Sequence, residues 1–253
     1  EGVFGVQTHA EDLVAFYDVT GWTLPYAFGL RHDALSTGPA GQARIGVAAT
    51  PEGLTKPRVP VRPDAGVLAY VIDWSHFNAP KSVNRILRYD LRAKVLPNPV
   101  TLETPSGRVE VPRGAVMVPV RRQDMTPDDI YELIARAVEE DGVTVHAALT
   151  SRTLEGSDLG GFQAAALTKP KVLLLTGRTG GRAGVSDNDA GEVWHYLDKM
   201  LHIPVTLIDV TDVRASHFAD HTHVIAVGGS YGGVSDTVVT ALKSWIRGGG
   251  VFI

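Results

Sequence analysis

The chain has 253 residues, of which 44% are hydrophobic and 21% charged, a composition that excludes disordered and fibrous classes and allows one large or two ordinary domains. The formal net charge of −4 and the absence of a long basic run indicate no nucleic acid partner. There is no cysteine, which excludes disulfides, thiolate metal sites and cysteine nucleophiles within these residues. No run approaches the roughly 20 apolar residues that span a bilayer, so we expect no transmembrane segment.

Both ends of the sequence have the character of cut ends. Glu1 follows no signal region in this chain, and residues 251–253 form an apolar run typical of a buried strand. We therefore expect a fragment, truncated at its C-terminus, that carries no targeting signal of its own.

The first part of the chain, residues 1–160, is predicted to be a mixed α/β region. Prolines and turn residues separate short apolar runs, and two stretches have apolar residues at helical spacing. In chain order the pattern predicts a strand at 67–72, a helix beginning near 80, a β-hairpin at 100–111, a strand at 115–120, a helix beginning at 127 and a strand at 143–149. The polar, glycine-bearing stretch 151–161 is the predicted boundary.

The second part, residues 161–253, predicts a parallel sheet covered by helices on both faces. Continuous apolar runs alternate with amphipathic helical patterns, as in three-layer α/β domains. The strands are expected at 172–175, 205–210, 223–227 and 251–253. One helix begins at Ser186 with an apolar face that includes Met200, and a second carries the apolar stripe of Val238, Leu242, Trp245 and Ile246.

A glycine-rich loop follows the first of these strands and precedes a helix. Backbone N–H groups at such a place favour an anion, and Arg178, Gly180, Gly181 and Arg182 are the candidate ligand-binding residues. The spacing matches no phosphate-binding motif, and Asp187 and Asp189 would repel a phosphate. The alternative is a flexible surface loop with acidic residues that complement the helix dipole.

The turn after the third strand matches the pattern Gly-x-Ser-x-Gly. Gly228, Gly229 and Ser230 are therefore candidate catalytic residues of a serine hydrolase, in which such a turn exposes the nucleophile. The order of residues argues against this, because no histidine follows Ser230 in the chain. The alternative is a tight turn that uses the positive φ available to glycine.

The densest group of histidines consists of His217, His221 and His223. Neutral imidazoles at this spacing are able to bind a metal ion, which makes them the candidate metal ligands. The alternative is a histidine-bearing surface loop that enters a strand. The chain contains no His-Glu-x-x-His motif.

Two parts of the sequence resemble parts of known families. Residues 16–25, Phe-Tyr-Asp-Val-Thr-Gly-Trp-Thr-Leu-Pro, resemble a segment just downstream of the catalytic domain in certain large carboxypeptidase A-like zinc metallopeptidases. Residues 171–175, 190–194 and 224–229 resemble the first half of a class I glutamine amidotransferase-like domain, which has a flavodoxin-like three-layer fold and follows a mixed α/β region in those peptidases. Gly228 and Gly229 match the positions that supply an oxyanion-hole amide in true amidotransferases.

The resemblance implies an accessory, non-catalytic region of a zinc carboxypeptidase-like protein. The zinc ligands and the cysteine elbow of the two families are absent from this sequence, so we expect no cofactor in this chain and zinc in the parent's peptidase domain. That domain and the parent's peptide substrate are the expected partners, and the resemblance implies an extracellular or periplasmic location. Two alternatives stay open: a free-standing amidotransferase-like or serine-hydrolase-like enzyme, and a small-molecule binding module.

Overall fold

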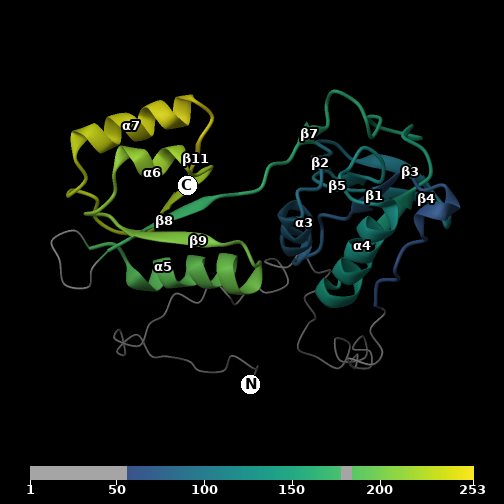
Figure 1. Ribbon diagram of the computed structural model, residues 1–253, viewed down its shortest axis with the longest axis horizontal. Coiled ribbons are helices and arrows are strands. Elements are labelled where there is room, and N and C mark those ends of the chain that lie inside the picture. Colours follow the sequence, from purple (N-terminus) through teal and green to yellow (C-terminus); the bar gives the residue numbers. More distant parts are fainter. Residues whose placement is uncertain (1–55, 178–183) are drawn as a thin grey trace, which may run out of the picture. The chain divides into compact units, whose positions relative to one another are not determined.

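In the computed structural model, residues 56–177 and 184–253 are described, and they contain two main β-sheets (Figure 1). The first sheet has five antiparallel strands, and the second has four parallel strands. All the described residues belong to one unit that runs from Thr55 to Ile253. The sequence's expectation of α/β structure with a parallel sheet in its second part is confirmed.

The antiparallel sheet has the strand order β6-β1-β5-β2-β7, with a separate hairpin β3-β4. Its strands are β1 (Ala69–Ile72), β2 (Lys94–Val95), β5 (Val116–Pro119), β6 (Val145–Ala148) and β7 (Ala165–Ala166), and the hairpin is formed by β3 (Val100–Thr104) and β4 (Gly107–Val111). A short 3₁₀ helix, η4 (Pro63–Ala65), precedes β1. Because β7 pairs with β2, the chain leaves this sheet only after Ala166, beyond the polar stretch 151–161.

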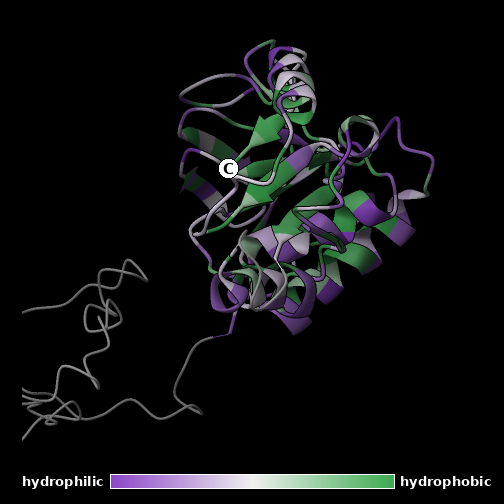
Figure 2. Cartoon of the chain, turned by 90° about the vertical axis from the view of Figure 1, so that its left-hand side faces the viewer, coloured by the Kyte–Doolittle hydropathy of each residue, from purple (hydrophilic) through white to green (hydrophobic). Residues whose placement is uncertain are grey.

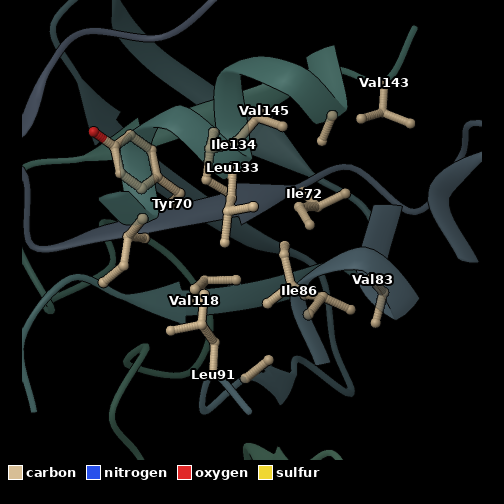
Figure 3. Packing of buried hydrophobic residues seen from close by; sticks show 14 of the residues in the cluster. Tyr70, Ile72, Val83, Ile86, Leu91, Val118, Leu133, Ile134, Val143 and Val145 are labelled. Carbon is tan, nitrogen blue, oxygen red and sulfur yellow. The ribbon is translucent and has the colours of Figure 1, made fainter. Parts of the chain in front are cut away.

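Two helices cover one face of the antiparallel sheet. They are α3 (Ala79–Arg88) and α4 (Pro127–Asp141), and each has a proline in its first turn, where the missing N–H has no helical partner to lose. Thr126 caps α4 by accepting a hydrogen bond from the amide of Asp129. The strand alternation places Tyr70 and Ile72 on this face, where they meet the apolar stripes of both helices. Figure 3 shows this packing, with side chains from the sheet and from both helices directed at one another.

The opposite face of the same sheet packs against the hairpin. Ala69 and Val71 alternate with Tyr70 and Ile72 along β1, and they contact a second apolar cluster that includes Leu102 of β3 and the loop residue Leu159. All four of these β1 residues are buried, so the strand is apolar throughout rather than alternating. A strand with both faces covered needs this pattern.

The parallel sheet has the order β11-β10-β8-β9. Its strands are β8 (Val172–Thr176), β9 (Val205–Asp209), β10 (His223–Ala226) and β11 (Val251–Phe252). The helices α6 (Ala215–Ala219) and α7 (Asp236–Arg247) lie on one face, and α5 (Asp187–Trp194), continued by the π-helical segment η5 (His195–Met200), lies on the other (Figure 1). Figure 2 shows hydrophobic strands between helices that carry hydrophilic residues. The sheet therefore has helices on both of its faces.

The helix after β8 differs from the expected regular helix in its second half. The turn from His195 to Met200 is π-helical, which adds residues to each turn and shifts the register of the apolar face. Leu201 is buried as expected, but Met200 is 41% exposed rather than on the packed face.

Replacing Gly191 by alanine is expected to stabilise the chain by about 1 kcal/mol, the usual difference between the two residues inside a helix. Gly191 lies within α5, and a methyl group added to it would meet no other atom within 4 Å. Urea unfolding of the variant and the parent chain measures the change in the free energy of unfolding. An unchanged or lower value would show that the helix is not formed as described.

Candidate functional site

The strand order locates the candidate site. In chain order the strands of the parallel sheet run second, first, third and fourth, so the order reverses between β8 and β10. Open α/β sheets bind their ligands beyond the carboxyl ends of the strands at such a reversal. We call the described residues at this place, 177, 184–189 and 227–231, the switch-point edge. It contains the Gly-Gly-Ser turn that the sequence singled out.

The two loops of the switch-point edge are joined by backbone hydrogen bonds. Val185 and Gly229 form an isolated antiparallel bridge. On its two sides, the amide of Ser186 donates to the carbonyl of Gly228 at 2.8 Å, and the amide of Ser230 donates to the carbonyl of Gly184 at 3.0 Å. The turn after β10 is thus fixed to the loop after β8.

Glycine is required here because the backbones approach closely. Gly229 has φ +151°, and a Cβ at this residue would lie 2.6 Å from both the carbonyl oxygen of Gly184 and the Cα of Val185. A Cβ at Gly228 would lie 2.5 Å from a carboxylate oxygen of Asp189, and one at Gly177 would lie 2.8 Å from the amide nitrogen of Val185. The contacts of Gly177 and Gly229 are with backbone atoms and exclude a side chain, so these two glycines serve the joining of the loops. The contact of Gly228 is with the end of a flexible side chain, which is able to move aside.

The polar side chains of the switch-point edge are mainly acceptors. Ser186 caps α5 by accepting a hydrogen bond from the amide of Asp189 at 3.2 Å, and Asp187 and Asp189 lie in the first turn, where negative charge complements the helix dipole. Tyr231 donates to the carbonyl of Val227 at 2.7 Å. Burial and the nearby charge of Asp189 raise the pKa of Tyr231, so this phenol stays protonated and remains a donor. These charges favour a cationic or hydroxyl-bearing ligand over a phosphate.

Ser230, the candidate nucleophile, lies exposed at the switch-point edge. Its backbone is outside the positive-φ region, which in the described residues only Asp90, Arg122 and His202 enter among the non-glycines. Its backbone amide donates a hydrogen bond to the carbonyl of Gly184. Gly228 and Gly229 have backbone roles, and the role of Ser230 as a nucleophile stays a prediction.

The three candidate metal ligands are each engaged locally. The Nδ1 atom of His217 accepts from the amide of Arg214 at 3.0 Å, that of His221 lies 2.6 Å from the carbonyl oxygen of His217, and that of His223 lies 2.8 Å from the hydroxyl of Thr222. In residues 56–177 and 184–253, no group of three or more histidine, aspartate or glutamate side chains is arranged to hold a metal ion. The remaining candidates, Arg178, Gly180, Gly181 and Arg182, lie outside the described residues.

Sequence reasoning assigned no site role to two residues of this edge. Tyr231 was passed over inside the Gly-x-Ser-x-Gly pattern, and Val185 carries no chemistry in its side chain. The signal that the sequence offers for both residues is their position in the chain. Two glycines after a strand allow the turn to pack against the neighbouring loop at the start of a helix.

Comparison with known proteins finds no matching family, no matching curated protein and no matching solved structure. Within the part of the chain that the structure describes, no helix combines the length and apolar character needed to cross a membrane.

Proposed function

We propose that this chain is an accessory, non-catalytic region of a zinc carboxypeptidase-like protein, whose parallel sheet belongs to a class I glutamine amidotransferase-like, flavodoxin-like domain. In this proposal the parent hydrolyses C-terminal peptide bonds, with its zinc held by another domain. That peptidase domain and the peptide substrate are the partners, and the location is extracellular or periplasmic.

The observation that carries the proposal is that the turn after β10 is bound to the loop after β8. In an amidotransferase this turn presents an amide to the reacting oxygen, a role that needs a donor directed at the substrate. Here the two residues that match the oxyanion-hole positions are held against the loop after β8: the carbonyl of Gly228 accepts from the amide of Ser186, and Gly229 packs against the backbone of Val185. The turn thus joins two loops, which supports a structural role for the element that would be catalytic in the resembled enzymes.

Two further observations agree with the proposal. The order in which the four parallel strands lie, 2-1-3-4 in chain numbering, is that of the first four strands of flavodoxin-like sheets. The stretch 16–25, which carries the resemblance to the peptidase family, lies outside the described residues and contributes through its sequence alone.

The proposal predicts that the purified chain does not release C-terminal residues from N-acylated dipeptides, with or without added zinc. A zinc carboxypeptidase assayed in parallel serves as the positive control, and equilibrium dialysis measures zinc bound to the chain. Release of amino acids that a chelator abolishes, together with stoichiometric zinc, would contradict the proposal.

A second candidate function is the binding of a small molecule at the switch-point edge. The observation that favours it is the reversal of strand order between β8 and β10, with the exposed side chains of Asp189 and Ser230 beside it. Thermal-shift measurements with sugars, nucleosides and amines test it. Stabilisation that is lost on replacing Asp189 by asparagine supports the candidate, and flat profiles for all three classes count against it.

A further inference from the structure

A polar cavity lies away from the switch-point edge, beside the helices of the antiparallel sheet. Its volume is about 310 Å³. It is lined by residues of α3 and its end, of α4, and of the turn before β9: Lys81, Asn84, Arg85, Arg88, Tyr89, Leu133, Arg136 and His202. Four of these side chains are basic, and none is acidic.

Two of the four basic side chains are compensated by carboxylates. Lys81 lies 3.0 Å from the carboxylate of Asp141, and Arg85 pairs with Asp141 at 3.0 Å and with Glu140 at 2.7 Å. Burial alone would make the charged form of Arg85 less favourable, but the hydrogen bonds from Arg85 to these two carboxylates raise its pKa. These ion pairs fix the two side chains in the wall of the cavity.

Arg136 has no acidic partner among the described residues. Three glutamates of α4 lie at the spacing where a helix forms ion pairs with Arg136: Glu132 and Glu140 are four residues away, and Glu139 is three residues away. Glu132 pairs with Arg62 at 3.0 Å, and Glu140 pairs with Arg85. Two of these three glutamates are therefore paired with other arginines, and in the described residues Glu139 forms no ion pair with the exposed Arg136.

Arg88 likewise has no acidic partner in the described part of the chain. It lies in the last turn of α3, where a positive charge complements the helix dipole. The helix dipole therefore accounts for Arg88 at the end of α3. It does not account for Arg136, which lies within α4 rather than in its last turn. Of the four cations that line the cavity, Lys81 and Arg85 are thus paired with carboxylates and the two others are not.

The cavity also has a defined wall. Asn84, which is 3% exposed, donates through its Nδ2 atom to the carbonyl oxygens of His202 at 2.7 Å and of Leu201 at 3.3 Å. His202 has φ +57°, a left-handed conformation that this pair of hydrogen bonds helps to hold. The turn that presents His202 to the cavity is therefore fixed to α3.

We propose that this cavity binds a small polyanion that carries phosphate or carboxylate groups, with Arg88 and Arg136 as its principal ligands. Guanidinium groups match both kinds of oxyanion with paired N–H donors. A volume near 310 Å³ is at the small end of ligand sites, which suits a compact molecule. The site is independent of the peptidase assignment, since none of its residues belongs to the switch-point edge.

Isothermal titration of the whole chain with pyrophosphate and with citrate, at constant ionic strength, tests the proposal. Each arginine is expected to contribute one charge-assisted contact, so Arg88→Ala and Arg136→Ala each weaken binding about tenfold. Whichever of the two ligands binds more tightly identifies the group that the site prefers.

The matched control is the double variant Arg108→Ala/Arg113→Ala, which removes two exposed arginines outside the cavity. It is expected to leave both affinities unchanged. A second pair, Arg88→Lys and Arg136→Lys, keeps the charge without the paired donors and is expected to bind with intermediate affinity. Absence of binding by the unmodified chain would overturn the proposal, and so would an equal loss in the control.

Discussion

Replacing Gly229 by alanine is expected to lower the free energy of unfolding by about 3 kcal/mol. Two costs combine. A non-glycine residue at φ +151° is strained, and the added methyl group would lie 2.6 Å from backbone atoms of Gly184 and Val185. Backbone atoms are unable to move aside as a flexible side chain does, so the bridge between Val185 and Gly229 has to open. Urea unfolding followed by tryptophan fluorescence measures the change.

Gly232 provides the matched control three residues further along the same turn. It has no positive φ in the left-handed range, and an added methyl group would meet only the hydroxyl of Ser230, at 3.9 Å. Gly232→Ala is therefore expected to change stability by less than about 0.5 kcal/mol. Equal effects of the two substitutions would show that the joining of the loops is not what requires Gly229.

Replacing Asp141 by asparagine is expected to cost about 3 kcal/mol at neutral pH. The side chain of Asp141 is fully buried at the end of α4, and its carboxylate receives Lys81 at 3.0 Å, Arg85 at 3.0 Å and the hydroxyl of Ser82 at 3.0 Å. The amide keeps the shape but leaves two partly buried cations without their counter-charge, and breaking a buried ion pair in this way is costly. Urea unfolding at pH 7 measures the loss.

The pH dependence of this effect follows from the pKa of Asp141. Burial alone would raise this pKa, but the hydrogen bonds from Arg85 and Lys81 outweigh burial and lower it below the usual value. A lowered folded-state pKa gives stability that is present above the unfolded value of about 3.9 and is lost as the pH falls through the folded value. The difference between the parent chain and Asp141→Asn should thus be constant from pH 7 to about 5 and shrink in stronger acid.

Glu140 is the control for Asp141 because it also pairs with Arg85, although its side chain is 54% exposed. Glu140→Gln is expected to change stability by less than about 0.5 kcal/mol, as is usual for an exposed ion pair. A loss as large as that of Asp141→Asn would mean that burial is not the source of the effect.

Much of the fold could be predicted from the sequence, because apolar periodicity reports which faces are buried. The runs 172–175, 205–210 and 223–227 became β8, β9 and β10, and Pro127 marked the first turn of α4. The elements that the sequence did not predict are short. The strands β2 and β7 have two residues each, and α6 has five, lengths at which no period is established. The π-helical turn at 195–200 has no signature in the apolar pattern.

The candidate site could be predicted only in part. Gly228, Gly229 and Ser230 stood out because they form a short motif, but the motif does not reveal that the turn pairs with Val185. The basic cavity was invisible in the sequence, since Arg88 and Arg136 are separated by a strand-rich stretch of chain. Glu132 and Glu140, the glutamates four residues from Arg136 on either side, pair with Arg62 and Arg85 instead. Such competition between ion pairs is a property of the folded chain.

The most direct test of the accessory-region proposal is to read the coding sequence upstream of Glu1. The proposal predicts an upstream His-x-x-Glu motif followed by a distant histidine, the zinc ligands of a carboxypeptidase A-like domain. An upstream sequence that encodes no such ligands would contradict it and would leave the switch-point edge as the place to look for this chain's function.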